Sequence, residues 1–337
     1  MSLVVRGTRV LVTGAAGFIG MHVARALLDA GATVTGVDNF DPYYDVRLKE
    51  SRVASLARHP SFALVRADLA EAGVCEALLR EHRCTAMIHL AAQAGVRHSL
   101  LAPESYVRNN LVAFGHVLEA CRHVQIEHLV YASSSSVYGG NDVLPFGEDQ
   151  RVDHPVSLYA ATKAANELMA HSYCHLFGFP ATGLRFFTVY GPWGRPDQAA
   201  MLFTRAILAG EPISVFNGGR MQRDFTFIDD ISDGVLRALA APPGRDVDGA
   251  PHMVFNLGNH EPVELEAFIA VLEELLGRKA IRDSRPMQPG DVQATYASIE
   301  RARAALGFAP RTSLREGLAR FVDWYRDYYG SGEGAPG

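Results

Sequence analysis

Short apolar runs and amphipathic segments alternate along the first half of the chain. Apolar or β-branched runs of strand length occupy residues 8–13, 33–37, 62–65, 86–90, 128–132 and 182–186. Apolar residues at helical spacing occupy residues 18–30, 74–81, 104–122 and 157–177. Strands that are apolar on both faces and alternate with helices are typical of a parallel sheet covered on both sides. The pattern predicts an α/β fold with a doubly wound parallel Rossmann sheet.

The pattern changes after about residue 186. Proline, glycine and arginine are frequent in residues 191–223. Further helices are predicted at 199–208, 231–240, 263–276 and 314–328, and further strands at 213–216 and 254–257. We expect a smaller α/β substrate lobe interleaved with the first. The predicted domains are 1–186 plus about 227–258 for the Rossmann domain, about 187–226 plus 259–330 for the smaller lobe, and a disordered tail at 331–337.

Composition narrows the class of protein. The chain has 337 residues, of which 48% are hydrophobic and 20% charged, as in ordinary globular proteins. A net charge of -5 argues against nucleic-acid binding, and no apolar run or N-terminal pattern predicts a membrane span or a signal peptide. The four cysteines lack metal-ligand spacing, so we expect no metal site and reduced thiols in a cytoplasmic protein.

A glycine-rich turn joins the first predicted strand to the first helix. Gly14, Gly17 and Gly20 would permit a tight turn, a close approach to a pyrophosphate and tight packing of the helix on the strand. The helix N-terminus would offer N–H donors to the phosphates. Asp38 ends the second strand, 18 residues after Gly20, where a carboxylate accepts bonds from ribose hydroxyls and repels a 2′-phosphate. These features predict NAD rather than NADP.

Two further features suggest acid–base chemistry. Tyr159 and Lys163 are four residues apart in a predicted helix, so they share one face. A nearby ammonium lowers the pKa of a phenol, which would let Tyr159 act as a general base. A run of serines, 133–136, follows the strand 128–132 at the edge of the sheet where ligands bind. Tyrosine and lysine are common on helix surfaces, so only the combination with the glycine turn supports a catalytic site.

Several motifs occur in the order typical of one superfamily. TGAAGFIG, HLAAQAGVR, YASSSSVYG, YAATKAANE and LRFFTVYGP resemble the extended short-chain dehydrogenases/reductases, and the resemblance extends to about residue 330. It implies that Ser134, Tyr159 and Lys163 are catalytic, with Lys163 also bonding the nicotinamide ribose. The predicted cofactor-binding residues are Gly14, Gly17, Phe18, Ile19, Asp38, Asn39, Asp68, Leu69, Leu90, Ala91, Ala92, Asn110, Tyr159 and Lys163.

The serine run also bears on the reaction. Related dehydratases and decarboxylases, which likewise begin by oxidising C4 of a nucleotide sugar, carry an acidic residue in this loop. Here the loop is all serine, which favours return of the hydride to the other face, or C4 epimerisation. Because that hydride returns, NAD should remain bound through turnover.

Four segments narrow the resemblance to UDP-glucuronate 4-epimerases: GVRHSL, GPWGRPD, MQRDFTFIDDI and QPGDV. In that family Arg195 and Thr188 would hold the substrate carboxylate and Arg223 would meet the diphosphate. The predicted substrate-binding residues are Arg97, Ser99, Ser134, Ser135, Ser136, Thr188, Arg195, Arg223 and Asp291.

The chain departs from the family near the sugar. His98 stands where many relatives have tyrosine, and Gln198 follows GRPD where methionine is usual. The alternatives are a UDP-glucose/UDP-galactose 4-epimerase, disfavoured by Arg195, a UDP-glucuronate decarboxylase, disfavoured by the missing loop acid, and a non-catalytic NAD-binding regulator. The resemblance also implies a homodimer that pairs the helices 104–122 and 157–177 of two subunits.

Overall fold

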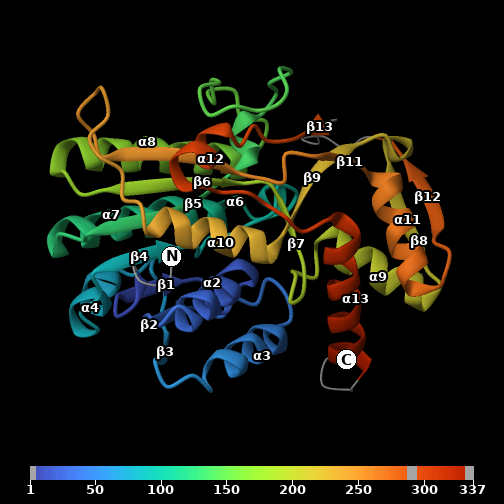
Figure 1. The fold of residues 1–337 in the computed structure, drawn as a ribbon, viewed down its shortest axis with the longest axis horizontal. Coiled ribbons are helices and arrows are strands. Elements are labelled where there is room, and N and C mark those ends of the chain that lie inside the picture. Colours follow the sequence, from blue (N-terminus) through green and yellow to red (C-terminus); the bar gives the residue numbers. More distant parts are fainter. Residues whose placement is uncertain (1–4, 287–293, 331–337) are drawn as a thin grey trace.

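The computed structural model describes residues 5–286 and 294–330. Within them, seven parallel strands form the central sheet (Figure 1). Their order across the sheet is β10 (His252–Leu257), β6 (Ala181–Phe186), β5 (His128–Ser134), β4 (Ala86–His89), β1 (Arg9–Thr13), β2 (Thr33–Asp38) and β3 (Phe62–Arg66). Strand order reverses between β1 and β4, as in a doubly wound sheet. The predicted fold class is therefore confirmed.

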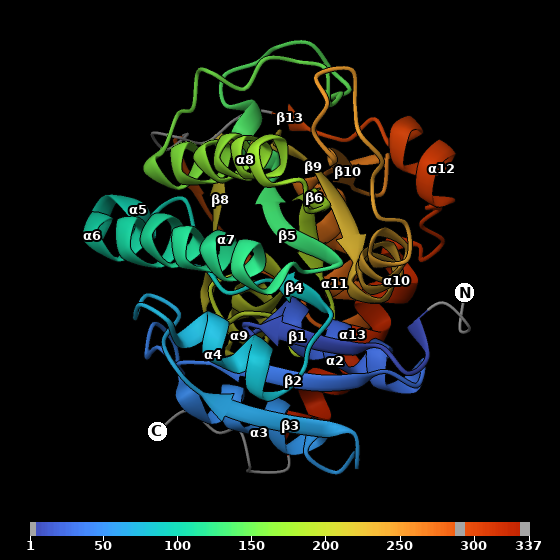
Figure 2. The same cartoon turned by 90° about the vertical axis from the view of Figure 1, so that its left-hand side faces the viewer.

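Helices cover both faces of this sheet (Figure 2). On one face lie α2 (Phe18–Asp29), α3 (Val46–Leu56) and α10 (Ile228–Leu239), with α2 packed between the other two. On the other face lie α4 (Val74–Glu81), α7 (Ala113–Val124) and α8 (Leu158–Phe177), again packed side by side. The sequence pattern did not predict α3. Asp45 caps it by accepting a hydrogen bond from the backbone N–H of Arg47.

The prediction of one continuous helix over 104–122 is wrong, because the structure divides this segment. The structure has α5 (His98–Leu101), α6 (Pro103–Tyr106) and a π-helical segment, η1 (Val107–Val112), before α7. Within η1, the backbone carbonyl of Asn110 accepts a bond from the Asn166 side chain at 2.7 Å. The buried amide of Asn110 donates to the backbone oxygen of Gln93. Side chains thus occupy groups that the regular ladder would use, and helices widen at such points.

The smaller lobe is built around short strands and three helices of the described residues. β9 (Gln222–Phe227) pairs with β7 (Thr188–Tyr190), β11 (Pro262–Glu264) and β13 (Ala294–Thr295), and β8 (Pro212–Phe216) pairs with β12 (Ile281–Arg285). The helices are α9 (Ala199–Ala209), α11 (Leu265–Leu276) and α13 (Leu314–Gly330). The structure also has two short 3-10 helices, η2 (Ser135–Tyr138) and η3 (Asn217–Gly219), and the short α-helix α12 (Glu300–Leu306).

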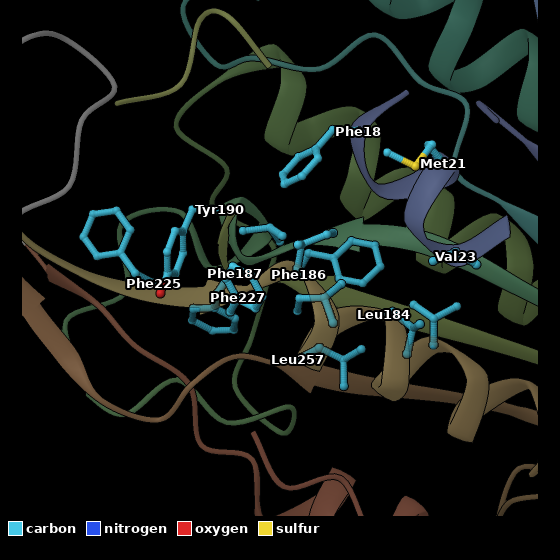
Figure 3. Close-up of a cluster of buried hydrophobic side chains, with 14 of the residues drawn as sticks. Phe18, Met21, Val23, Leu184, Phe186, Phe187, Tyr190, Phe225, Phe227 and Leu257 are labelled. Carbon is cyan, nitrogen blue, oxygen red and sulfur yellow. The ribbon is translucent and has the colours of Figure 1, made fainter. Parts of the chain in front are cut away.

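The two lobes share one hydrophobic core. Phe18 and Met21 of α2, Phe186 of β6, and Phe225 and Phe227 of β9 belong to the same buried cluster (Figure 3). Helix α12, which the predicted domain division places in the smaller lobe, packs against α10 and β10 of the large sheet. The predicted tail at 331–337 lies outside the described residues. Among those residues, no helix is long and apolar enough to cross a membrane.

Candidate active site

A cavity lies at the carboxyl ends of the central strands, between the large sheet and the smaller lobe. It brings together most of the predicted site residues from segments far apart in the sequence. Those that line it are Gly14, Gly17, Phe18, Ile19, Asp38, Asn39, Asp68, Leu69, Leu90, Ala91, Ala92, Ser134, Ser135, Ser136, Tyr159, Lys163, Thr188 and Arg195. This edge is where ligands bind in open α/β sheets.

The glycine turn has no room for larger residues. Gly14 has φ +67, and a Cβ there would lie 2.8 Å from the backbone nitrogen of Ala91. A Cβ on Gly20 would lie 2.0 Å from the carbonyl oxygen of Gly14, so α2 packs directly on the turn. Gly17 is the N-cap of α2 and makes no side-chain cap bond, while Phe18 and Ile19 of the first turn line the cavity. This arrangement fits a pyrophosphate at the helix N-terminus.

Asp38 is fixed at the end of β2 by the backbone around it. Its two oxygens accept hydrogen bonds from the N–H groups of Ala16 and Phe40, at 3.1 and 2.8 Å. The ammonium of Lys49 lies 4.0 Å from Asp38, and burial lowers the pKa of Lys49 even though Asp38 and Asp41 oppose that shift. Each carboxylate oxygen can accept more than one hydrogen bond. The remaining acceptor capacity of Asp38 therefore suits the ribose hydroxyls of NAD, which would donate to it.

The predicted catalytic residues meet on one wall of the cavity. Burial raises the pKa of Tyr159, while a hydrogen bond with Ser134 and the charge of Arg195 lower it. Burial also lowers the pKa of Lys163 to about 8, against the charge of Glu167. The Lys163 ammonium donates to the carbonyl of Ala132 at 2.9 Å. Lys163, which we expected to lower the pKa of the phenol, is not among the groups that shift it, and desolvation of the phenol is the largest effect.

A buried ion pair supports the serine strand from behind. Glu167 of α8 and Arg185 of β6 join at 2.7 Å, with side chains 8% and 5% exposed. The Ser133 hydroxyl donates to Glu167 at 2.5 Å, and Arg185 donates to the hydroxyl of Tyr138 at 2.9 Å. Removing either charge would leave the other unpaired in the interior. The pair thus holds α8, β5 and β6 in register beneath the catalytic residues.

The loop that carries Arg195, residues 191–198, is held from the opposite lobe. Arg52 of α3 is fully buried and donates to the backbone oxygens of Trp193, Gly194 and Ala16, at 2.6, 3.2 and 3.0 Å. The ring of His22 on α2 hydrogen-bonds the carbonyl of Pro192 at 3.0 Å. Residues of the cofactor lobe therefore position the loop that brings Arg195 and Gln198 to the cavity.

Four of the predicted residues that the structure describes do not line the cavity, and a further one, Asp291, lies outside the described residues. Asn110 is 2% exposed and holds the loop at Gln93, while its neighbour Asn109 lines the cavity instead. The Ser99 hydroxyl is buried and donates to the Val96 carbonyl. The guanidinium of Arg97 lies over the ring of Phe216, and Arg223 donates to the carbonyl of Gln222.

Sequence reasoning missed other lining residues. Among them are Tyr43, Lys49 and Asn109. The apolar spacing of residues 46–56 and the acidic cap before them could have revealed α3 and so placed Lys49 near the cofactor turn. No local signal marks Tyr43, because its place in the cavity depends on a loop that meets distant segments.

The parallel sheet, the glycine turn and the shared wall of Ser134, Tyr159 and Lys163 together define a class of NAD-dependent enzymes. A family model for the NAD dependent epimerase/dehydratase family matches residues 10–258, and the chain belongs to this family.

Several similar proteins are named UDP-glucuronate 4-epimerases. The chain is 47% identical over 333 residues to a probable UDP-glucuronate 4-epimerase of Rhizobium meliloti, covering 95% of this chain and 98% of the relative. It is 48% identical to UDP-glucuronate 4-epimerase 3 of Arabidopsis thaliana, covering 98% of this chain and 79% of the relative. The UDP-glucuronic acid 4-epimerase of Bacillus cereus, solved with UDP-glucuronic acid and NAD, superposes with a TM-score of 0.88 at 34% identity, covering 96% of this chain and 100% of that one.

Proposed function

We propose that this protein interconverts UDP-glucuronic acid and UDP-galacturonic acid by epimerisation at C4, using NAD that stays bound. The observation that carries the proposal is the shared cavity. Tyr159 and Ser134 line the same space as Arg195 and as the glycine turn. The relatives named above act on UDP-glucuronate and span nearly the whole chain. When bound, NAD supplies the ring that accepts the hydride from C4 and gives it back.

The roles of the catalytic residues follow from their surroundings. Tyr159 takes the proton of the C4 hydroxyl, because its bond with Ser134, the charge of Arg195 and the positive ring of bound NAD⁺ would together oppose the rise in its pKa that burial causes. Ser134, its hydrogen-bond partner, orients that hydroxyl. Lys163 supplies a positive charge on the same helix face, and the low pKa of about 8 leaves it mostly protonated at neutral pH. Returning the hydride to the opposite face requires the keto sugar to rotate, while its diphosphate stays bound.

The carboxylate of the substrate needs its own partner. Oxidation at C4 creates a β-keto acid, which loses CO₂ when the C5–C6 bond aligns with the carbonyl π system. Arg195 and Thr188 both line the cavity and offer donors for a carboxylate. Holding the carboxylate away from that alignment is what separates an epimerase from a decarboxylase.

The test is incubation of purified protein with UDP-glucuronic acid and no added NAD, followed by NMR. Formation of UDP-galacturonic acid without CO₂ supports the proposal, and a pentose product or an unchanged substrate overturns it. Tyr159→Phe should lower kcat by about 10³-fold, because the base is removed while the fold is kept. Arg195→Ala should raise the fraction of pentose product. Unchanged product ratios in that variant would contradict the role of Arg195.

We further propose that the protein is a homodimer. Leu168 and Leu176 of α8 are 72% and 67% exposed, and Val107 and Val112 of η1 are also exposed. Exposed apolar side chains on adjacent helices are typical of subunit contacts. Leu168→Glu should halve the mass measured by light scattering, whereas Val247→Glu, in an exposed loop, should not. A monomeric wild-type protein would contradict the proposal.

The predicted cellular location rests on the state of the cysteines. All four cysteines are free and buried, namely Cys75, Cys84, Cys121 and Cys174. Unpaired thiols are typical of proteins kept in a reducing compartment, so we propose a cytoplasmic location. Fractionation of cells that express the protein at native level tests this proposal, and recovery outside the cytoplasm contradicts it.

A further inference from the structure

The guanidinium of Arg195 already has a carboxylate partner within its own loop. Its Nε and Nη2 donate to Oδ1 and Oδ2 of Asp197, at 3.0 and 3.1 Å. This side-on pair uses one edge of the guanidinium. The N–H groups of Nη1 and the second N–H of Nη2 form another edge, which remains for a further acceptor. Asp197 therefore determines how the plane of the Arg195 side chain is rotated.

Asp197 is itself held from the cofactor lobe. The Tyr43 hydroxyl donates to Oδ2 of Asp197 at 3.2 Å. Tyr43 lies between β2 and α3, and its ring packs against His98 with the ring centroids 4.5 Å apart. Tyr43, Asp197 and Arg195 thus form a short chain of contacts from one lobe to the other. We call these three residues the clamp triad.

The backbone around Arg195 is already held by other groups, so only the orientation of its side chain depends on Asp197. The backbone before it is fixed by Arg52, and its own N–H donates to the Gln198 side chain at 3.1 Å. The side chains of Arg195 and Asp197 are 24% and 34% exposed. An ion pair this open to water contributes little to stability. Orientation of the guanidinium, rather than stability, is what the pair provides.

We propose that Asp197, held by Tyr43, is a positioning residue that turns the free edge of Arg195 toward the sugar carboxylate and so determines whether the 4-keto sugar keeps its carboxyl group. This inference rests on the proposed function. In the competing reaction the C5–C6 bond breaks and its electron pair passes to the C4 carbonyl as an enolate. C6 leaves as CO₂, and C5 then takes a proton, so no oxidant or reductant is consumed.

The negative charge of Asp197 gives the proposal a distinctive signature. It partly cancels the attraction between Arg195 and a carboxylate substrate, so Asp197 weakens binding while it improves orientation. Asp197→Asn should therefore lower the KM for UDP-glucuronate by about three-fold, since a repulsive charge is removed at a partly exposed site. The same variant should release more CO₂, because an amide cannot accept both Arg195 bonds. A general loss of structure would not produce these two changes together.

The experiment uses UDP-glucuronic acid labelled with ¹³C at C6 and follows labelled UDP-galacturonic acid against labelled CO₂ by NMR. Asp197→Ala should raise the CO₂ share about ten-fold, and Tyr43→Phe should act in the same direction but less. The inhibition constant of UDP-glucose, which has no carboxylate, should stay within about two-fold of wild type. Asp283→Asn is the matched control, because Asp283 pairs with Arg285 two residues away on β12.

Each outcome decides one question. An unchanged product ratio and KM in Asp197→Ala overturn the role of Asp197. A parallel loss of UDP-glucose binding also overturns it, since the residue would then only support the fold. Equal effects of Asp283→Asn would mean that any lost surface charge is sufficient, which again contradicts the proposal. Failure of the wild-type protein to convert UDP-glucuronate would overturn the proposed function instead.

Discussion

The cofactor turn and the loop 191–198 face the same cavity but are built in different ways. The turn is made of backbone and lacks room for side chains, as the close approaches at Gly14 and Gly20 show. The loop is held by side chains that reach it from other elements, chiefly Arg52 and His22. Local spacing in the sequence can specify the first kind of site. The second kind depends on how distant segments meet.

The largest effect should come from the turn. Gly20→Ala would place a Cβ 2.0 Å from the Gly14 carbonyl, against backbone that cannot move aside. We expect a loss of bound NAD and a fall in the free energy of unfolding of about 3 kcal/mol. The NAD released on denaturation and the thermal midpoint measure these effects.

The control for this variant is Gly244→Ala, since nothing lies within 4 Å of a Cβ at Gly244. It should keep both NAD and stability. If Gly20→Ala retained its NAD, the close packing of α2 on the turn would not be needed for cofactor binding.

Arg52 tests whether the two regions are linked. Arg52→Met would leave the carbonyls of Ala16, Trp193 and Gly194 without their donor in a buried place. We expect a loss of about 2 kcal/mol in urea unfolding. The KM for UDP-glucuronate should also rise. Arg58→Met, at an exposed position just after α3, is the control.

Retention of NAD distinguishes two outcomes for Arg52→Met. If NAD is retained while the KM rises, the turn is independent of the loop. If both are lost, the buried arginine couples them. A normal KM would show that the loop does not need Arg52.

The stability of the protein should fall at low pH because His22 is buried with a lowered pKa. Burial lowers the pKa of His22 to about 4, with Arg52 and Arg25 adding to this and Asp229 opposing it. The unfolded state then binds more protons between pH 6.5 and 4, so stability is present above pH 6.5 and is lost as the pH falls. At pH 5.5 the loss from one such histidine is on the order of 1 kcal/mol.

Urea unfolding at pH 7.5 and pH 5.5 measures this loss. His22→Gln keeps a donor for Pro192 and should reduce the pH-dependent loss by about that amount. His89, His128 and His252 also have lowered pKa values and should give the variant a residual slope. An identical pH dependence in wild type and variant would contradict the assignment to His22.

The smallest effect is expected at Gln198. Its side chain accepts from the N–H of Arg195 and donates to the carbonyl of Val189, at 3.1 and 3.2 Å. Gln198→Met restores the residue usual in the resembling family and should cost about 1 kcal/mol or less. Epimerisation should persist. Leu202→Met, a conservative change on α9, is the control, and a larger loss of activity than of stability would show that Gln198 also acts on the sugar.

Prediction from sequence succeeded where a structure repeats or is local. The parallel sheet follows from strands and helices that alternate along the chain. The glycine turn and the Tyr159–Lys163 helix each follow from spacing within one segment. It failed at η1, where Asn166 of another helix bonds the carbonyl of Asn110 and widens the helix. It also did not reveal that burial is the largest effect on the pKa of Tyr159, because burial is a property of the folded molecule.

The sequence by itself determined the class of fold and the position of the cofactor turn, since glycine spacing and apolar alternation act on the nearest backbone. The tertiary structure alone brought Tyr43 to Asp197 and Arg52 to the loop of Arg195. These partners are separated by 154 and 141 residues in the chain. Hydrogen bonds require atoms within about 3 Å, and only the completed fold brings positions so far apart to that distance.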